Sequence, residues 1–295
     1  MQSAKVLRTI LSKEKTIIVP GAYDAFSAKI LKQAGFEVIY MTGSGVTASL
    51  IGMPDVGLLT MTEMVNQARN IVNATDLPLI CDADNGYGNP INVIRTVKEY
   101  ERAGVAGIHI EDQVAPKRCG HFEGKQVIAA EEMVKKIKAA LYARENEDFL
   151  LIARTDARSI LGLEEALRRA HLYVESGADM IFVESPESVE ELHRIAGEFR
   201  GVHLLVNMVE GGRTPVLPFE DLENMGFKIV LYPTSGIRAV AKTLQDLAHH
   251  LSTYKNTFDF ESRLVPFEGR NDITGLSVIK ELEEKFVYPS NPKNS

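Results

Sequence analysis

Short apolar runs recur along the chain, and each is followed by a turn and a segment with helical spacing. The runs are almost continuously apolar, which is typical of strands that are buried on both faces of a parallel sheet. There are eight of them, and they begin at Thr16, Glu37, Leu77, Ala106, Phe149, Met180, His203 and Lys228. The pattern therefore predicts eight parallel strands.

The segments between these runs predict amphipathic helices. In residues 163–177 (LEEALRRAHLYVESG), one face is apolar and the Glu and Arg residues lie opposite. The apolar face consists of Leu163, Ala166, Leu167, Ala170 and Val174. Four helices are expected to end at a glycine just before the next strand, because glycine readily forms a left-handed cap. These glycines lie in residues 34–36, 103–105, 176–178 and 225–227.

Eight strand–helix units within about 250 residues predict an α/β protein with a closed (β/α)8 barrel of the TIM type. A doubly wound open sheet remains an alternative, but it normally carries a G-x-G-x-x-G turn that this sequence lacks. We interpret residues 1–295 as one barrel domain, in which residues 252–295 are a C-terminal helical extension. The first fifteen residues predict a short amphipathic helix.

The extension predicts one more amphipathic helix. Its apolar stripe would have to pack on its own barrel or on a neighbouring subunit. The stripe consists of Ile273, Leu276, Ile279 and Leu282.

Composition excludes several classes of function. The 295 residues carry a net charge of −7, whereas nucleic-acid binding requires a basic face. No apolar run is long enough to span a bilayer, and the N-terminus lacks the layout of a signal peptide. Two cysteines are too few for a disulfide framework. We therefore expect a cytoplasmic protein that binds neither nucleic acid nor membrane.

Polar residues lie at the carboxyl ends of the predicted strands. In a (β/α)8 barrel these ends converge on one mouth, where catalysis takes place. The polar residues there are Thr42, Asp82, Asp84, Glu111, Arg154, Glu184, Asn207 and the corner from Tyr232 to Ser235.

The segment CDADNGYG predicts a metal site. Asp82 and Asp84 are two residues apart, so on an extended strand they point to the same side. Together with Glu111 they form an oxygen-only set that suits Mg²⁺ or Mn²⁺, whereas no spacing favours zinc. Because Mg²⁺ usually keeps several waters, we expect an open site. The alternative is a structural acidic turn before Asn85 and Gly86.

Other strand ends indicate a small anionic substrate. Arg154 stays charged, so it forms either a structural ion pair or a contact with a substrate carboxylate. The turn from Thr42 to Gly45, which includes Gly43 and Ser44, could present backbone N–H groups to an anion. Asn207 precedes a Gly-Gly turn and adds an amide.

Residues 112–125 (DQVAPKRCGHFEGK) form a hydrophilic segment that we expect to be a loop outside the core. Lys117, Arg118 and His121 surround Cys119, and nearby positive charge lowers the pKa of a thiol. Gly120 and Gly124 would allow such a loop to move over the mouth. An activated catalytic thiol and an exposed thiol without a role both fit the residue types.

Several motifs resemble the isocitrate lyase and phosphoenolpyruvate mutase superfamily over residues from about 5 to 245. The segment KRCGH is similar to the lyase branch, which includes 2-methylisocitrate and 2,3-dimethylmalate lyases, whereas the mutase branch typically has Asn-Ser-like residues there. The chain also lacks the large insertions of full-length isocitrate lyases. The motifs occupy residues 20–28, 40–45, 52–57, 82–89, 110–121, 153–158 and 232–233.

The resemblance implies roles for individual residues. Asp82 and Asp84 match the metal-site acids, and Asp55 and Glu111 match residues that hold metal-bound waters. Lys117, Cys119 and His121 match a gating loop in which Cys119 is the proton donor.

The remaining matches concern the substrate. Thr42 and Gly43, with Ser44 beside them, match the turn that binds the pyruvyl part, and Arg154 matches the arginine on the same carboxylate. Glu184 and Asn207 match residues near the second carboxylate. Gly120 is also expected to contact substrate.

The implied reaction is Mg²⁺-dependent cleavage of a 2-hydroxy di- or tricarboxylate to an α-keto acid and a carboxylate. Tyr40 or a metal-linked group would remove the hydroxyl proton. An oxaloacetate hydrolase or decarboxylase, a phosphonomutase-type enzyme and a non-catalytic dicarboxylate-binding barrel remain alternatives. The resemblance also implies a homotetramer whose last helix is exchanged between subunits.

Overall fold

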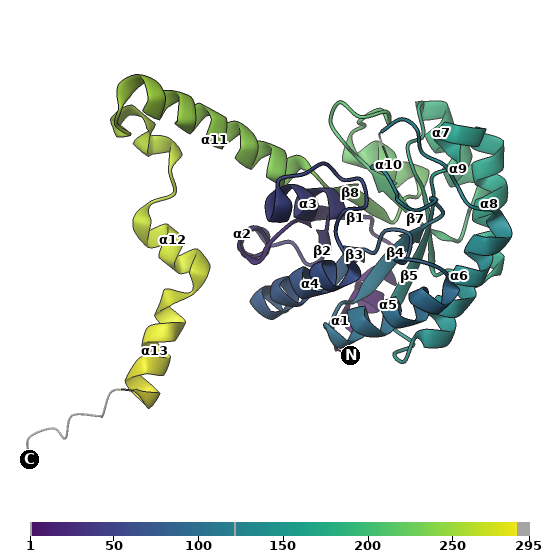
Figure 1. Cartoon of the computed structure of the whole chain (residues 1–295), viewed down its shortest axis with the longest axis horizontal. Helices are drawn as coiled ribbons and strands as arrows, with labels where there is room; N and C mark the ends of the chain where they lie inside the picture. Colours follow the sequence, from purple (N-terminus) through teal and green to yellow (C-terminus); the bar gives the residue numbers. More distant parts are fainter. Residues whose placement is uncertain (1, 121, 288–295) are drawn as a thin grey trace, which may run out of the picture. The chain divides into compact units, whose positions relative to one another are not determined.

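The computed structural model describes residues 2–120 and 122–287, and it contains a closed barrel of parallel strands surrounded by helices (Figure 1). Each strand pairs in parallel with its neighbours in the chain, and the first strand closes against the eighth. The strands are β1 (Ile17–Ala22), β2 (Ile39–Met41), β3 (Leu79–Asp82), β4 (Gly107–Glu111), β5 (Leu150–Thr155), β6 (Met180–Val183), β7 (His203–Asn207) and β8 (Ile229–Tyr232). The predicted fold and its eight strands are confirmed.

Helices alternate with the strands and cover the outside of the barrel. Apolar side chains of the helices and the outward side chains of the strands form one continuous core cluster. The helices are α1 (Gln2–Leu11), α2 (Ala25–Gln33), α3 (Gly43–Ile51), α4 (Met61–Thr75), α5 (Pro90–Arg102), α6 (Ala130–Ala143), α7 (Arg158–Leu161), α8 (Leu163–Glu175), α9 (Val189–Glu198), α10 (Phe219–Met225) and α11 (Ser235–Tyr254).

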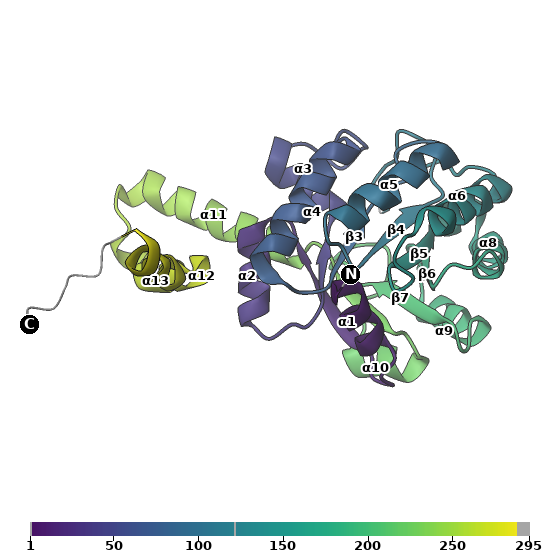
Figure 2. The ribbon, with the colours of Figure 1, turned by 90° about the horizontal axis from the view of Figure 1, so that it is seen from below.

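Helix α1 closes the amino end of the barrel (Figure 2). Its buried residues, among them Leu7 and Leu11, belong to the same core cluster as the side chains that fill the barrel interior, such as Ile80 and Ile152. The amphipathic helix predicted at the N-terminus is therefore confirmed. Because this plug fills one end, the opposite end is left for a binding site.

The predicted glycine stops are confirmed. Gly35, Gly104, Gly177 and Gly226 all have positive φ angles, between 85° and 101°, at the ends of α2, α5, α8 and α10. A left-handed residue there lets the chain turn directly into the next strand. Because the connections from these helices to the next strands are short, the carboxyl ends of neighbouring strands lie together at one end of the barrel.

The chain divides into two compact units, residues 1–238 and 239–295. The second unit contains the rest of α11, a 3-10 helix (Phe258–Arg263), α12 (Phe267–Thr274) and α13 (Leu276–Phe286). The single helix predicted for the apolar stripe is wrong, because Gly275 adopts φ 81° and separates α12 from α13. Leu276, Ile279 and Leu282 on α13 are exposed in this chain.

A search of the described residues for membrane-spanning helices finds no helix with the length and apolarity to cross a bilayer.

Candidate active site

A cavity of about 260 Å³ lies where the carboxyl ends of the strands meet. Most of the site residues predicted from the strand ends and from the segment 112–125 line this cavity. The predicted residues in its wall are Tyr40, Thr42, Ser44, Asp55, Asp82, Lys117, Cys119, Gly120, Arg154, Glu184 and Asn207. Gly43, Asp84 and Glu111 lie beside the cavity without lining it, and His121 lies outside the described residues.

Lys117 lies between two of the predicted metal-site acids. Its Nζ is 2.6 Å from Asp55 Oδ1 and 2.8 Å from Asp84 Oδ1, and all three side chains are buried. Lys117 was expected beside the Cys119 thiol, but its ammonium is committed to these carboxylates. A cation thus already neutralises part of the acidic cluster.

Asp82 and Asp84 lie close together, although not for the reason predicted. Strand β3 ends at Asp82, and Asp84 adopts a left-handed conformation with φ 48°. The Asp84 backbone N–H donates to Asp82 Oδ1 over 3.0 Å. The prediction of an extended strand through Asp84 is therefore wrong, and a tight turn brings the two carboxylates together instead.

The surroundings of Asp82 and Asp84 shift their pKa values in opposite directions. Burial raises the pKa of Asp84 to about 6, and Asp82 and Asp55 add to the rise while Lys117 opposes it. Burial also acts to raise the pKa of Asp82, but His109, which is protonated at the low pH where Asp82 titrates, and the cations Lys117 and Arg154 outweigh it and lower the pKa to about 2. Asp82 is thus a permanent anion, whereas Asp84 can take up a proton near neutral pH.

The donor chemistry fits a hard divalent cation. Lys117 pairs with the carboxylates of Asp55 and Asp84, and Glu111 Oε1 is buried with no hydrogen-bond partner among the described residues. Over the same residues, no three His, Cys, Asp or Glu side chains are arranged as a ready-made metal cage. Mg²⁺ is usually bound through one or two carboxylates and keeps several waters, and Asp82, Asp84 and Glu111 are the residues that could hold it.

Arg154 points into the site between three acids. The parallel register places it opposite Glu111 of β4, and its Nε is 3.3 Å from Glu111 Oε2. Its Nε also donates to Asp156 Oδ2 over 2.9 Å, and its Nη2 is 3.4 Å from Glu184 Oε2. These contacts fix the guanidinium, so both roles predicted for Arg154 fit, the structural ion pair and the substrate contact.

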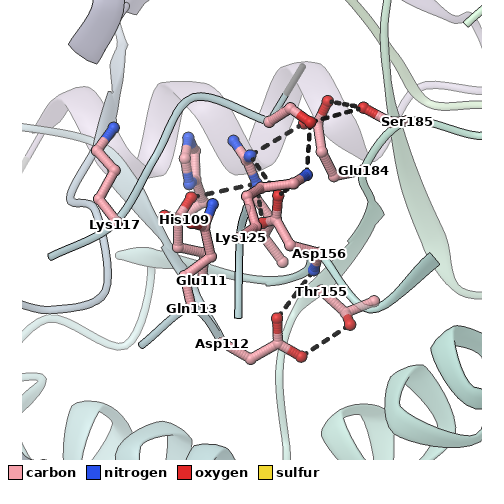
Figure 3. A network of polar contacts seen from close by, with 12 residues as sticks. His109, Glu111, Asp112, Gln113, Lys117, Lys125, Thr155, Asp156, Glu184 and Ser185 are labelled. Atoms are coloured by element: carbon pink, nitrogen blue, oxygen red, sulfur yellow. Dashed lines mark hydrogen bonds and ion pairs between the residues drawn. The ribbon is translucent and has the colours of Figure 1, made fainter. Parts of the chain in front are cut away.

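Another buried acid, Asp112, holds the two residues that follow Arg154, and Figure 3 shows its contacts with Thr155 and Asp156. Its Oδ1 accepts from the Asp156 backbone N–H over 2.8 Å, and its Oδ2 accepts from Thr155 over 2.8 Å. Tyr173 and Arg169 of α8 donate to Oδ2 as well, over 2.8 Å and 3.0 Å. The prediction that the arginines of α8 all face outward is wrong for Arg169, because Asp112 draws it inward.

The hydrophilic segment from 112 to 125 is not the solvated loop that its composition predicts. Asp112, Gln113, Lys117 and Lys125 are all buried. Each has a partner that compensates its burial; Gln113, for example, bonds the backbone N–H and carbonyl of Arg118 over 2.9 Å and 2.8 Å. The expectation that these polar residues lie outside the core is therefore wrong.

Cys119 lies in the cavity wall and is partly exposed. Its backbone N–H donates to the Asp55 carbonyl over 3.0 Å, which ties the loop tip to the segment after α3. The other cysteine, Cys81, is fully buried, and neither forms a disulfide. Cys119 is thus the thiol that a ligand in the cavity would meet.

Tyr40 reaches the cavity from β2 and contacts a buried histidine. Its hydroxyl is 2.7 Å from His109 Nε2. Burial raises the pKa of Tyr40 well above 10, and Asp82 adds to the rise, so the phenol keeps its proton. Burial likewise lowers the pKa of His109 to about 4 and keeps the ring neutral. In this state Tyr40 is a hydrogen-bond donor, and its role as the base stays a prediction.

The remaining rim offers groups for an anionic ligand. Thr42 caps α3, and a Cβ at Gly43 would lie 2.5 Å from Asp82 Oδ2, so only glycine fits there. Asn207 Oδ1 and Thr234 Oγ1 are buried at the cavity without a hydrogen-bond partner in the described part of the chain. Such atoms normally find a partner, which here can be a ligand.

Sequence reasoning missed several residues of the cavity wall. They follow β7 and β8 or belong to the loop tip, and of these residues only Pro233 falls within a motif. These residues are Phe122, Val209, Glu210, Pro233, Thr234 and Arg238. The Tyr232–Ser235 corner, noted as a polar strand end, was the one signal that pointed to two of them.

Known proteins resemble this chain over most of its length. Residues 7–252 match the family described as phosphoenolpyruvate phosphomutase, and the chain belongs to this family. The chain is 50% identical over 287 residues to a 2,3-dimethylmalate lyase of Eubacterium barkeri, which covers 97% of this chain and 99% of that protein. It is 44% identical over 257 residues to a 2-methylisocitrate lyase of Aeropyrum pernix, with 86% and 82% covered.

Solved structures of related proteins also superpose on this chain. A 2,3-dimethylmalate lyase, described as a member of the PEP mutase/isocitrate lyase superfamily, superposes with a TM-score of 0.92 at 34% identity and covers 99% of this chain and 98% of its own. Oxaloacetate acetylhydrolase bound to 3,3-difluorooxalacetate gives 0.91 at 36% identity, with 96% of each chain covered. Phosphonopyruvate hydrolase in complex with oxalate and Mg²⁺ gives 0.88 at 29%, with 98% and 100% covered.

The similarity extends over 99% of the 2,3-dimethylmalate lyase and 82% of the 2-methylisocitrate lyase, and it includes the barrel whose mouth is described above. The protein is therefore an enzyme, a lyase of carbon–carbon bonds of the 2,3-dimethylmalate and 2-methylisocitrate lyase kind. The resemblance seen in the sequence motifs is confirmed.

Proposed function

We propose that the protein is a Mg²⁺-dependent lyase that cleaves a 2-hydroxy dicarboxylate of the 2,3-dimethylmalate type into an α-keto acid such as pyruvate and a carboxylate. The observation that carries the proposal is the 50% identity to a 2,3-dimethylmalate lyase over 97% of this chain. The cavity supports it, because Cys119, Arg154 and Asp82 line one small space.

The cavity wall favours a dicarboxylate over a tricarboxylate. Its cations are Lys117, Arg154 and Arg238, and each is already paired with carboxylates of the chain. Arg213, which follows the Gly-Gly turn after Asn207, lies outside this cavity and is 3.3 Å from Glu187. A third carboxylate would therefore add negative charge for which the described residues of the wall supply no further cation.

Apolar groups in the same wall suit methyl substituents. Phe122, Val209 and Pro233 line the cavity. Burying a methyl group stabilises a complex by about 1 kcal/mol. These residues provide the apolar wall that a dimethylmalate requires. 2-Methylisocitrate, the substrate named for a 44% identical relative, is the second candidate.

Asp82 and Asp84 would hold Mg²⁺, and Asp55 and Glu111 would bond its waters, with the ion replacing the contacts of Lys117 to Asp55 and Asp84. When bound, the ion would stabilise negative charge on the substrate oxygens. The relative whose structure contains Mg²⁺ supports this choice of cation. Mn²⁺ has the same ligand preferences and should substitute.

The proposed reaction gives separate roles to Arg154, to a base and to Cys119. Arg154 binds the carboxylate beside the hydroxyl-bearing carbon, and a base takes the hydroxyl proton. The bond between the second and third carbons breaks, the hydroxyl carbon becomes the ketone, and the electron pair stays on the third carbon. Cys119 then donates its thiol proton to that carbon, and the thiolate recovers a proton from solvent.

A substrate panel tests the proposal. Purified enzyme with Mg²⁺ is incubated separately with 2,3-dimethylmalate, 2-methylisocitrate and oxaloacetate, and pyruvate, oxalate and acetate are quantified. We expect pyruvate from 2,3-dimethylmalate at the highest kcat/KM. Oxalate and acetate from oxaloacetate alone would instead assign the activity of its 36% identical structural relative.

We also propose a cytoplasmic homotetramer in which the helical extension packs on a neighbouring copy. The exposed apolar residues of α13 support burial in an assembly, and the absence of disulfides at Cys81 and Cys119 suits a reducing compartment. Light scattering coupled to gel filtration should give the tetramer mass for the full chain and a smaller mass after Leu276→Asp with Ile279→Asp. A monomer mass for the full chain would contradict the assembly.

A further inference from the structure

The segment between β4 and α6 is closed at its base, and at its tip the Cys119 backbone N–H donates to the Asp55 carbonyl over 3.0 Å. We call residues 112–128 the Cys119 loop. At the base, Gln113 and Val127 form an antiparallel bridge, the Val114 N–H donates to the Gln126 carbonyl over 2.8 Å, and the Ile128 N–H donates to the Asp112 carbonyl over 2.9 Å. The contacts at the base fix where the loop leaves the barrel but not how far its tip reaches over the cavity.

Lys125 supplies a contact at the tip. Its Nζ donates to the Gly120 carbonyl, next to Cys119, and to Asp156 Oδ1 over 2.9 Å. Ser185 Oγ donates to the same carbonyl over a longer distance, 3.3 Å. Figure 3 shows Lys125 lying between the loop and Asp156. The lysine thus joins the loop to the end of β5.

The carboxylate that receives Lys125 also holds the predicted substrate arginine. Asp156 Oδ1 accepts from Arg154 Nη2 over 3.1 Å, and Oδ2 accepts from Arg154 Nε over 2.9 Å. Behind it, Asp112 holds the Asp156 backbone N–H. Because Asp156 is fully buried, a change in one of its two cations changes the balance of charge at the other.

The loop tip also lies directly against the catalytic wall. A Cβ added at Gly120 would lie 2.6 Å from Glu184 Cδ and 2.7 Å from Arg154 Nη2. There is no room for a side chain while the loop keeps this position. The position of Gly120, and with it that of Cys119, is therefore tied to the position of Arg154.

Lys125 has no part in the proposed chemistry, yet it is a buried lysine with only 2% of its side chain exposed. Burying an ammonium is costly unless it is paired, so its contacts need a reason. We propose that Lys125 is a positioning residue that holds the Cys119 loop over the cavity and couples its position to Arg154 through Asp156. The functional meaning rests on the proposed role of Cys119, but the anchoring can be measured without any substrate.

Thiol alkylation measures the anchoring directly. Cys81 is fully buried and Cys119 is partly exposed, so the rate at which iodoacetamide modifies the native enzyme reports how accessible Cys119 is. The rate is compared for wild type, Lys125→Met and Lys125→Arg, with peptide mass spectrometry assigning the modified cysteine. Lys228→Met is the matched control, because Lys228 is a buried lysine at the opposite end of the barrel that bonds the Lys15 carbonyl over 2.9 Å.

Removing the buried charged contact should favour the open loop on the order of tenfold. We therefore expect Lys125→Met to accelerate alkylation of Cys119 by about that factor, Lys125→Arg to restore much of the protection, and Lys228→Met to leave the rate unchanged. A wild-type rate in folded Lys125→Met would overturn the proposal. An equal acceleration in Lys228→Met would do the same, because it would indicate general loosening of the fold.

A second variant covers the case in which Lys125→Met does not fold. Gly120→Ala leaves Lys125 in place but cannot keep the tip against Glu184 and Arg154, so it should also expose Cys119. Unchanged alkylation of Gly120→Ala would overturn the close approach on which the coupling depends.

Kinetics then separate this proposal from the proposed function. On a substrate that the panel identifies, Lys125→Met should lower kcat about tenfold while KM changes less, and Lys125→Arg should recover part of kcat. If the panel finds no lyase substrate but alkylation behaves as expected, the anchor stands and the proposed function fails. If wild type is active and Lys125→Met keeps both its kcat and its thiol protection, the anchor fails alone.

Discussion

Glu111 and Asp112 are neighbours in the chain at the end of β4, and both carboxylates are buried, but their surroundings differ. Each oxygen of Asp112 accepts hydrogen bonds, from Asp156, Thr155, Tyr173 and Arg169. Glu111 has a single ion pair, with Arg154, and its Oε1 has no hydrogen-bond partner among residues 2–120 and 122–287.

The difference follows from the alternation of side chains along a strand. Successive residues point to opposite sides, so Glu111 faces the barrel mouth and Asp112 faces the surrounding helices. A buried acid whose hydrogen bonds are complete stabilises the fold, whereas one with an unused oxygen is available to a ligand. Two acids of the same burial thus serve structure and chemistry, and the following experiments test that division.

The largest effect is expected on the ligand-facing side, at Cys119. Cys119→Ser should lower kcat about a thousandfold, because the hydroxyl is a much weaker acid than the thiol, while KM stays within a few-fold. Steady-state kinetics measure both constants, and Cys81→Ala, a change in a core cysteine away from the cavity wall, is the control. Turnover of Cys119→Ser at the wild-type rate would show that another group supplies the proton.

The next largest effect is expected on stability, at Asp112. Asp112→Asn leaves the buried Arg169 without one of its carboxylate partners, and breaking a buried pair in this way costs about 3 kcal/mol of unfolding free energy. Denaturant unfolding of the two proteins measures the difference. A loss well under 1 kcal/mol would mean that Glu165, the other partner of Arg169, is sufficient.

Unlike Asp112→Asn, Glu111→Gln should change Mg²⁺ binding more than it changes stability. Burial raises the pKa of Glu111 well above its usual range, although Arg154 opposes the rise, so a neutral amide costs the fold little, about 1 kcal/mol or less. Mg²⁺ affinity should fall about tenfold, since an amide cannot ionise to the carboxylate that a bound cation would favour. Calorimetric titration with Mg²⁺ measures this, and a strong loss of stability without a change in affinity would reverse the roles of Glu111 and Asp112.

An effect of the same size is a pH dependence at Asp84. Its pKa is raised to about 6 in the protein, chiefly by burial, so below that pH the carboxyl is neutral and a cation must displace its proton. Mg²⁺ affinity should therefore be constant above about pH 7 and fall about tenfold by pH 5. The same shift means that Asp84 destabilises the metal-free fold at neutral pH, and that this cost disappears as the pH falls from about 6 towards about 4.

Asp84→Asn is the control for this titration. It should bind Mg²⁺ weakly at every pH, and the drop between about pH 7 and pH 5 should be smaller than in wild type. An equal drop in both proteins would assign the titration to another group.

The fold could be predicted in detail because it depends on local patterns. Each apolar run became a strand, and each glycine stop is where a helix ends, since burial and φ angles follow from short stretches of sequence. The strand ends gave most of the cavity wall for the same reason, as the barrel brings them together whatever the loops do.

What could not be predicted depends on partners far apart in the chain. Lys117 and Lys125 look like surface lysines in a hydrophilic segment, and only the folded barrel brings Asp55 and Asp156 to them. Arg169 likewise has the helical spacing of an exposed residue until Asp112 meets it from the strand. No periodicity encodes such pairs, because each depends on side-chain geometry.

The most direct test of the central claim follows the proton that enters the product. In D2O with Mg²⁺, cleavage of 2,3-dimethylmalate should give pyruvate and propionate in equal amounts, with one deuterium on the second carbon of each propionate. That pattern requires carbon–carbon cleavage followed by protonation of the leaving carbon, the step assigned to Cys119. If wild-type enzyme forms no pyruvate, or forms propionate without deuterium, the assigned reaction is wrong.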